Sequence, residues 1–552
     1  MYHDKSYVIN SSIFMKTAFI FALILLSFFS LDAQDSIKTK TDSLKAKDDT
    51  VKVKNDTVNR ARGNDDLQLK VIKEVKVELH SDSTNNQPVT SDLIDSTKQN
   101  KYGDLLVDDP EYNKRYPLWI PAVEVFGINT LLNVVDRYVL KLDFANVNPT
   151  TWKRTISAGW PWGPGWEWDQ DRFANNFISH PYTGSLYYNA ARSNGYSFLL
   201  SATFAMGGSY MWKIFGERGT PEREDPINTT STGIFLGEIL YRLSSNILDD
   251  RTRGGDRVFR EIMAGLVDPI RGINRLFQGK TFRTTNKEVY AKEPVNVSLY
   301  SGIRKVDAIS GNLFDMGSYS WIINAQLDYG NPFEIRSRKP YDFFKFRVDA
   351  NFNVGRKWLD NVNGYGILFG KNYQLGNLAL LVGGFQYYDY WDNTTFELGS
   401  LGFGGGVVSK LPLSKTSNLY TSIHLAIVPF AGNSRRAGPD LSQVRDYNYG
   451  SGLEARFEST VNLGKYVTGT MIYYFYGFRP TFDGPAGNNF IHILRPRITV
   501  RLYKFLSIGA EDYLYYNDRY ENGLAPLHLV RSEQKIFLLI FLEDKQRRGY
   551  YN

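Results

Sequence analysis

The segment from Asn176 to Gly195 holds the residues whose types and spacing could do chemistry. We expect His180 and Pro181 to enter a helix there, because proline suits the first turn of a helix and glycine suits its end. Arg192 follows His180 by about three helical turns on a similar side, where its guanidinium could hold a phosphate. His180 could then act as a general base or contact a lipid headgroup. The structural alternative is a turn histidine that bonds backbone carbonyls.

Serines near this segment are the possible nucleophiles of such a site, namely Ser179, Ser185 and Ser197. None of them has the flanking glycines of a strained hydrolase elbow. An envelope lipid-modifying enzyme, similar to an acyl hydrolase, that uses His180, Arg192 and Ser197 is the alternative hypothesis. A non-enzymatic role is the primary one. The sequence contains no metal-ligand spacing, phosphate loop or dinucleotide fingerprint, so we expect neither a metal nor a cofactor.

A second histidine with a serine neighbour lies further along the chain, at Ser422 and His424. Outer-membrane acyl hydrolases resemble this arrangement, with the two residues two positions apart on a barrel strand, but their pair faces lipid. Here the residues between and beside the pair, Thr421, Ile423 and Leu425, form the better lipid-facing side. We therefore interpret His424 as a lumen histidine in a polar network.

Segments that alternate apolar and polar residues fill the C-terminal half of the chain, from about residue 295 to 544. Successive side chains of a strand point to opposite faces, so each segment predicts a strand with one apolar and one polar face. About twelve strands are expected, an even number, as closed bacterial barrels require. The expected strands are 296–305, 319–330, 342–354, 363–375, 378–391, 396–411, 418–430, 446–463, 467–479, 490–502, 505–520 and 529–544.

Two architectures suit such strands: a soluble sandwich with a buried core, or a membrane barrel with lipid outside and water inside. Both signs of charge recur on the polar sides of neighbouring strands, where they could pair across a wet lumen. Aromatic strand ends and the alternation of tight turns with long loops favour the barrel. The residues expected to line the lumen or bind a ligand are Arg495, Arg497, Arg501, Glu454, Arg456 and Glu458.

The N-terminal part of the chain has the pattern of a secretory signal. Lys16 precedes an apolar run, residues 18–31, that ends near the small residue Ala33 and is too short to span a membrane. Met15 could be the true start. We expect a signal peptide over residues 1–34, a disordered linker poor in aromatics over 35–100, a helical region over 101–285 and the barrel over 286–552.

Composition limits the classes of function. Aromatic residues make up 15% of the chain, which suits the aromatic belts of membrane proteins. There is no cysteine, which excludes disulfides, thiolate metal sites and a lipoprotein anchor. The net charge of +7 is spread without a dense basic run, so we expect no nucleic-acid binding. The expected partners are outer-membrane lipid, the barrel-assembly machinery and a small or lipidic ligand.

Small residues recur at four-residue spacing in two of the expected helices, at Ser201, Ala205 and Ser209 and at Gly233 and Gly237. Small residues at this spacing let two helix backbones approach closely, in membranes and in soluble cores alike. A last helix, residues 256–277, is interrupted by a proline and carries several arginines. We expect these arginines on a solvated face, with contact to anionic headgroups as the alternative.

The pattern His-Pro-x-x-Gly-x-x-Tyr-x-x-x-Ala-Arg-x-x-Gly resembles the uncharacterised family called domain of unknown function 3943, whose members are similar to outer-membrane proteins of Gram-negative bacteria. The resemblance covers about residues 145–277. It departs at Lys213, where we expect an acidic residue. The resemblance implies location and architecture but no activity. Besides His180 and Arg192, the motif or structural residues are Asn176, Pro181, Gly184, Tyr187, Gly195, Trp212 and Glu238.

The sequence therefore predicts a secreted outer-membrane protein: an all-β membrane barrel of about twelve antiparallel strands, preceded by an α-helical region, a signal and a disordered leader. We expect the helical region at the periplasmic mouth of the barrel or as a plug in its lumen. The barrel would be structural, or would pass or hold a small or lipidic ligand. If the strands do not form a barrel, the alternative is a soluble periplasmic binding protein with a β-sandwich fold.

Overall fold

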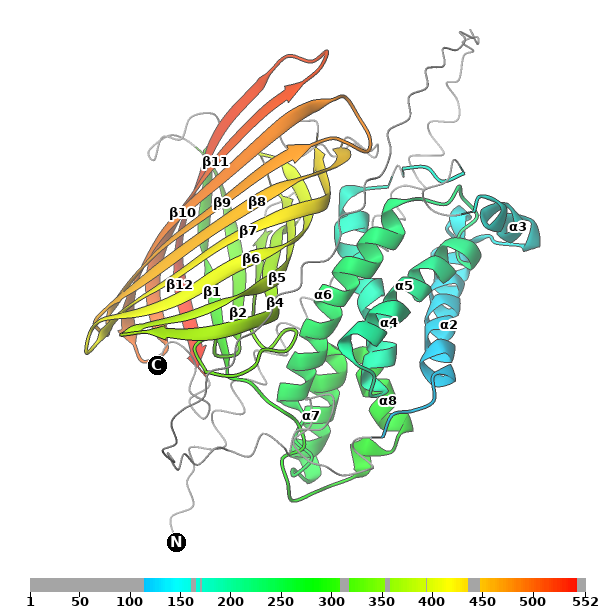
Figure 1. The fold of residues 1–552 in the computed structure, drawn as a ribbon, viewed down its shortest axis with the longest axis horizontal. Helices are drawn as coiled ribbons and strands as arrows, with labels where there is room; N and C mark the ends of the chain where they lie inside the picture. Colours follow the sequence, from blue (N-terminus) through cyan, green and yellow to red (C-terminus); the bar gives the residue numbers. More distant parts are fainter. Residues whose placement is uncertain are drawn as a thin grey trace, which may run out of the picture.

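The structure, a computed structural model, describes residues 114–159, 165–168, 171–307, 317–352, 358–393, 395–434 and 447–543. The expected signal peptide and linker, residues 1–100, lie outside the described residues. Within the described part, helices precede strands in the chain, and the two kinds of element lie side by side as a helical layer and a barrel (Figure 1).

The helical layer contains seven α-helices in the described residues. Side chains begin several of them: Ser197 accepts a hydrogen bond from the backbone N–H of Leu200 (3.4 Å), and Asp268 accepts one from the N–H of Arg271 (3.1 Å). The helices are α2 (Trp119–Val134), η3 (Val135–Val139), η4 (Asp143–Ala145), α3 (Pro149–Ser157), η5 (Asn175–Ser179), α4 (His180–Ser193), α5 (Phe198–Phe215), α6 (Glu224–Ile247), α7 (Gly254–Val267), α8 (Pro269–Phe277) and η6 (Lys280–Phe282).

Twelve antiparallel strands close into a barrel in which each strand pairs with its neighbours in sequence and β1 pairs with β12. This confirms the predicted fold class. The strands are β1 (Val295–Asp307), β2 (Gly317–Tyr329), β3 (Phe344–Phe352), β4 (Leu359–Leu375), β5 (Leu378–Asp392), β6 (Glu397–Ser414), β7 (Ser417–Ser434), β8 (Tyr447–Leu463), β9 (Val467–Arg479), β10 (Gly487–Tyr503), β11 (Leu506–Glu521) and β12 (Leu527–Glu543).

Polar side chains reach across the lumen between strands that are not neighbours. The hydroxyl of Tyr513 on β11 donates to Asp349 on β3 (2.6 Å). Arg347 on β3 donates to the hydroxyl of Tyr474 on β9 (2.8 Å) and pairs with Glu458 on β8 (2.8 Å). Such contacts are possible only if the polar faces of the strands point into the barrel. The barrel is thus charged within, as the alternation predicts.

Aromatic side chains fill much of the remaining lumen. Among the aromatic residues expected at the strand ends, Tyr387, Tyr474 and Tyr513 do not form a belt, because their inward positions bury them among one another and beside the charged groups. A belt residue would instead stay at the outer surface. The inward, buried aromatic residues include Tyr365, Tyr387, Trp391, Tyr474, Tyr476, Tyr513 and Tyr515.

The helical layer lies against the outer wall of the barrel. Phe235 of α6 packs its ring 5.6 Å from the ring of Tyr388 and 6.4 Å from that of Phe346. Phe346 lies between Lys345 and Arg347, which face the lumen, so its own side chain points outward. The expectation of a helical plug or a domain at the mouth is therefore wrong. Strand side chains fill the lumen, and the helices cover the outside (Figure 1).

A second contact joins the start of the helical motif to the same wall. Phe177 of η5 sits over Gly399 of β6 and Gly432 of β7, where a Cβ atom would collide with its ring. Asn176 donates to the hydroxyls of Tyr447 (2.7 Å) and Tyr449 (2.9 Å) on β8. Outward glycines leave room for a helical side chain, and outward tyrosines supply polar partners for it.

No α-helix in the described ranges combines the length and the apolar character needed to cross a bilayer.

Candidate functional site

Helices α4 and α6 form the centre of the helical layer and run in the same direction. Gly184 of α4 lies against Thr229 and Gly233 of α6, and a Cβ atom on Gly233 would come within 2.6 Å of the Cα of Gly184. The four-residue spacing of Gly233 and Gly237 thus serves the close helix approach that the sequence predicts. Because the backbones touch, polar groups at both ends of the pair are held at fixed distances.

At the N-terminal end of this pair, His180 faces a carboxylate. Its Nε2 atom lies 3.2 Å from Oδ1 of Asp225, which is buried in the first turn of α6. The side chain of His180 is 18% exposed. His180 therefore lies against a side chain. The structural alternative that we expected from the sequence was a turn histidine that bonds only backbone carbonyls.

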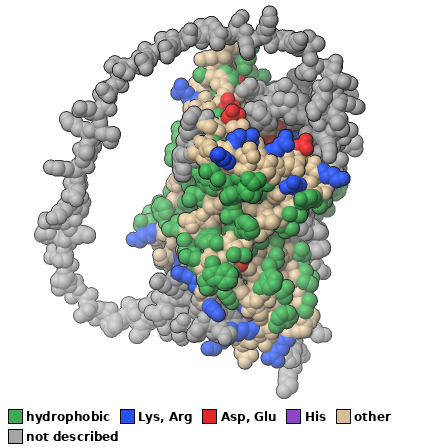
Figure 2. Space-filling view, turned by 90° about the vertical axis from the view of Figure 1, so that its right-hand side faces the viewer, with side chains coloured by type: hydrophobic (Ala, Val, Ile, Leu, Met, Phe, Trp, Pro, Cys, Tyr) green, Lys and Arg blue, Asp and Glu red, His purple; other side chains and the backbone are tan. Residues whose placement is uncertain are grey.

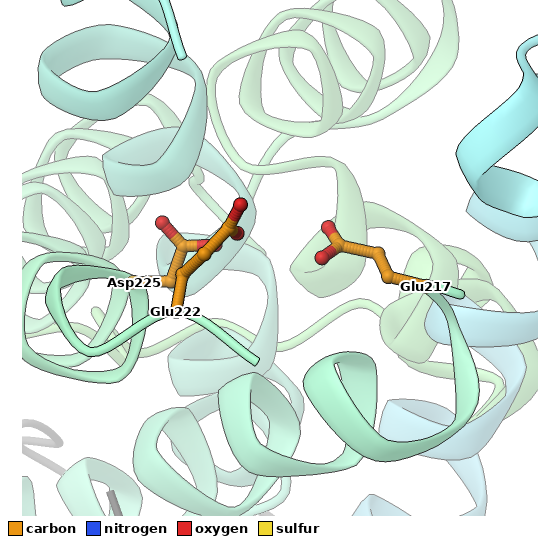
Figure 3. A group of neighbouring side chains, drawn as sticks. All are labelled: Glu217, Glu222 and Asp225. Carbon is orange, nitrogen blue, oxygen red and sulfur yellow. The ribbon is translucent and has the colours of Figure 1, made fainter. Parts of the chain in front are cut away.

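Lys213 of α5 joins the same group of residues. Its ammonium pairs with Glu217 (2.5 Å), Glu222 and Asp225, although the lysine side chain is 1% exposed. Figure 3 shows Glu222 and Asp225 side by side, with the carboxylate of Glu217 across from them. We call Lys213, Glu217, Glu222 and Asp225 the lysine–carboxylate cluster.

Three carboxylates with oxygen atoms within 4.8 Å of one another could hold a metal ion. Here the ammonium of Lys213 supplies the positive charge among them. One ammonium cannot neutralise three carboxylates. Burial raises the pKa of Glu222, in the loop before α6, well above its usual range, although Lys213 acts in the opposite direction. The cluster is therefore a largely buried network that the ammonium of Lys213 holds together.

The C-terminal end of the helix pair holds a second buried network, centred on Glu238 of α6. Its carboxylate accepts hydrogen bonds from Arg192 (2.8 Å), Arg242 (2.8 Å) and the hydroxyl of Tyr188 (2.6 Å). Arg192 also stacks over the ring of Tyr241 at 4.4 Å. The guanidinium that could have held a phosphate is thus engaged inside the protein.

The structure does not bring the three catalytic candidates together. His180 and Arg192 lie at opposite ends of α4, about 18 Å apart at 1.5 Å per residue, and each bonds a different carboxylate. Ser197 caps α5 and accepts from the N–H of Leu200. Ser185 is buried and donates to the carbonyl of Tyr182 (2.6 Å). No described serine, Ser179 included, makes a hydrogen bond to His180.

The remaining motif residues have packing roles. Pro181 is in the first turn of α4, and Gly195, just past its end, has a φ of 88°, which favours glycine. Tyr187 is buried and donates to Asn129 of α2. Trp212 donates its indole N–H to Glu217. The motif therefore specifies a packed helical centre.

Residues 165–270 match the model of a family described as a domain of unknown function, DUF3943. The matched stretch lies within the helical layer, and we call residues 165–270 the DUF3943 domain after this match. Both buried networks and the contact of η5 with the barrel wall fall within the DUF3943 match. No curated protein matches the chain.

Solved structures with similarity to the chain are outer-membrane barrels. The NanC porin is 12% identical, with a TM-score of 0.24, and the match covers 44% of this chain and 98% of NanC. The outer membrane channel DcaP of Acinetobacter baumannii is 8% identical, with a TM-score of 0.22, over 45% and 96% of the two chains. The TodX monoaromatic hydrocarbon channel is 9% identical, with a TM-score of 0.20, over 46% and 90%.

The lumen candidates fall into two groups. Five of them are held by opposite charges inside the barrel: Arg495 and Arg497 by Glu511, Glu454 and Arg456 by each other, and Glu458 by Lys345 and Arg347. Arg501 instead lies exposed at the end of β10. His424 faces the lumen, where its Nδ1 lies 2.9 Å from the hydroxyl of Tyr387.

Sequence reasoning missed Asp225, and it named Glu238 as a motif residue without its partner Arg192. Asp225 follows His180 by 45 positions, and Glu238 follows Arg192 by 46. When two helices run in the same direction, residues that pair at one end of the helices and residues that pair at the other end are separated by nearly the same number of positions in the sequence. That regularity is the signal that could have linked His180 to Asp225, but it is visible only once α4 and α6 are known to be neighbours.

Lys213→Ala is expected to destabilise the DUF3943 domain and to make its stability depend on divalent cations. Without the ammonium, the buried Asp225 and the partly exposed Glu217 and Glu222 repel one another, and the expected loss is about 3–5 kcal/mol. Calcium can neutralise such a group of oxygen ligands, so it should restore part of the loss. The measurement is thermal unfolding with and without calcium. Lys153→Ala, at an exposed position on α3, is the control and should show neither effect, and a calcium shift in the wild type would contradict the role given to Lys213.

Proposed function

We propose that this protein is an outer-membrane barrel with a sealed lumen, whose role is to anchor and position the DUF3943 helical domain along its wall. The observation that carries the proposal is the set of ion pairs and hydrogen bonds that cross the lumen between distant strands. A barrel that passes a solute needs an open lumen. A barrel that serves as an anchor needs only a stable interior and an apolar exterior.

The interior is a charged core in which ion pairs join distant strands. Arg456 of β8 pairs with Asp389 of β5 (2.5 Å), three strands away. Arg304 of β1 pairs with Asp360 of β4 and with Glu533 of β12 (3.3 Å). Buried charges of this kind are costly to separate, because each one left alone would be uncompensated. They therefore hold the barrel in one closed arrangement.

One cavity among these groups is small. A cavity beside Arg347, His424, Arg456 and Tyr474 has a volume of about 10 Å³, enough for about one water molecule. A hydrated ion or a small metabolite needs a continuous path that is much wider. The lumen of the described strands thus supports an anchor and gives no support to a ligand-holding barrel.

Where the helices do not cover the barrel, its outer surface suits a bilayer. Leu425 of β7 is 66% exposed and Ile536 of β12 is 66% exposed. Similar outward residues follow along β7 to β12 and onto β1, among them Ile423, Ile427, Leu453, Ile498, Leu538 and Ile303. An apolar exterior around a charged interior is the arrangement of transmembrane barrels and is the reverse of a soluble sandwich.

In planar lipid bilayers the purified protein is expected to give no stepwise ion conductance. A variant with Arg347→Ala, Tyr474→Ala and Tyr513→Ala removes three side chains that meet in the lumen, and it should conduct. Heat-modifiable gel mobility checks that both proteins form barrels. Stepwise currents from the wild type, equal to those of the triple variant, would show an open lumen and contradict the proposal.

A further inference from the structure

The two C-terminal helices of the helical layer have their charges inside and their apolar residues outside. Arg257 of α7 and Arg271 and Arg275 of α8 are buried, so the expectation of solvated arginines is wrong for these three. Arg275 pairs with Asp250 (2.9 Å) and Glu261 (2.7 Å). Apart from the exposed Asp256, which pairs with Arg260 at the start of α7, the outward residues of the same helices are apolar: Val258, Phe259, Ile262, Ile273, Leu276 and Phe277.

Helices α2 and α5 present outward faces without a charged side chain. The one charged residue of α2, Glu124, is turned inward and accepts hydrogen bonds from Asn194 (2.8 Å) and Asn274 (2.9 Å). The one charged residue of α5, Lys213, is buried in the lysine–carboxylate cluster. The exposed residues of these faces include Trp119, Val123, Phe126, Leu131, Val134, Leu199 and Met206.

This distribution is the reverse of that in a water-soluble helical layer, where the outward side of each helix is charged and the inward side is apolar. Figure 2 shows the outer face of the helical layer, with an apolar zone across its middle and lysine and arginine side chains above and below it. An exposed apolar area of this extent marks a binding surface.

We propose that the outer face of the helical layer lies in the bilayer and contacts lipid acyl chains, with the basic residues at its two ends against anionic headgroups. The proposal rests on the proposed function, because it requires the barrel to be in a membrane. The helical layer then takes the place of lipid along the wall from β3 to β8, and lipid contacts the helices instead.

Length and charge favour lipid as the occupant. Helix α2 has 16 residues and continues into the five residues of η3. At about 1.5 Å per residue α2 alone is about 24 Å long, which is most of the roughly 30 Å hydrocarbon core of a bilayer, and η3 with Asp136 and Arg137 would extend into the headgroup region. Lys114 and Arg115 precede this stretch and Lys141 follows it, all three exposed. Basic side chains at both ends of an apolar span can reach anionic headgroups on both sides.

Site-directed spin labelling tests the proposal directly. The chain has no cysteine, so single substitutions give one label each. Phe126→Cys on α2 and Met206→Cys on α5 probe the helical face, Leu425→Cys on β7 probes the barrel wall, and Lys153→Cys on α3 probes the basic end. Each full-length variant is placed in vesicles of phosphatidylethanolamine and phosphatidylglycerol. The collision of the label with oxygen, which is lipid-soluble, is compared with its collision with a water-soluble nickel complex.

The ratio of oxygen to nickel collisions at Phe126 and Met206 is expected to be close to that at Leu425 and several-fold above that at Lys153. High nickel collision at the two helical positions, with Leu425 in lipid, would overturn the inference and leave the barrel in the membrane. Low collision with both reagents at the helical positions would mean that a protein covers the face, and would also overturn it. High nickel collision at Leu425 would overturn the proposed function itself.

Discussion

Glu238→Ala is expected to lower the free energy of unfolding of the helical layer by about 3–5 kcal/mol, because it leaves buried cations without their partner. Arg192 is 4% exposed and Glu238 is fully buried. The variant removes the acceptor of Arg192, Arg242 and the hydroxyl of Tyr188 at once. Denaturant unfolding followed by the helical circular-dichroism signal measures the loss, since the barrel contributes little to that signal.

The matched control breaks an ion pair of the same layer at the surface. Asp256 of α7 pairs with Arg260 (3.1 Å), and the aspartate side chain is 46% exposed. Asp256→Ala should cost about 0.5 kcal/mol or less, as exposed pairs one helical turn apart do. Glu238→Gln keeps the shape but not the charge, and should fall between the two. Equal losses for Asp256→Ala and Glu238→Ala would contradict the burial argument.

Gly184→Ala is expected to separate α4 from α6 and to cost about 3 kcal/mol or more, because overpacking cannot be relieved against a backbone. The added Cβ would overlap the carbonyl oxygen of Thr229 and come within 3.0 Å of the Cα of Gly233. Neither neighbour is a flexible side chain that could move aside. Denaturant unfolding measures the loss, and protease sensitivity in the loop between α5 and α6 should rise with it.

Gly127→Ala on α2 is the control for this prediction. A Cβ atom there meets nothing within 4 Å. Alanine is the better helix former, so this variant should gain up to about 1 kcal/mol. The same glycine-to-alanine change is therefore expected to lower the free energy of unfolding at Gly184 and to raise it at Gly127. A stabilising Gly184→Ala would show that α4 and α6 are not in backbone contact.

The barrel could be predicted from the sequence because alternation is a local signal. In β3, Lys345 and Arg347 alternate with Phe344 and Phe346, and this fixes two faces without knowledge of any partner. Pairing across the lumen is not local. Nothing in the sequence links Asp349 to the hydroxyl of Tyr513, since these residues meet only after the barrel has closed.

The position of the helical layer could not be predicted from the apolar pattern, because an outward phenylalanine suits lipid and helix equally well. A subtler signal exists on the covered wall. Gly364, Gly399 and Gly432 face outward where helical phenylalanines approach, and Tyr388 and Tyr449 face outward where they bond η5. Outward glycines and tyrosines together on a barrel wall indicate a protein neighbour, because lipid offers a hydroxyl no partner.

The packing role of the motif could not be predicted for a related reason. The types of His180 and Arg192 suggested chemistry, and both are used instead to fasten the ends of one helix pair. Their partners Asp225 and Glu238 lie on a helix whose neighbour and direction no local pattern specifies. A motif built from ionisable residues is consistent with catalysis or with packing, and only the partners decide between them.

The covered wall has a consequence for the order of assembly. The helices come first in the chain, yet the surface against which Phe177 and Phe235 pack is made of β3 to β8. That surface does not exist until the strands have joined edge to edge. The half of the protein that is synthesised first therefore completes its folding last, and until then it must be kept from aggregating on its way to the membrane.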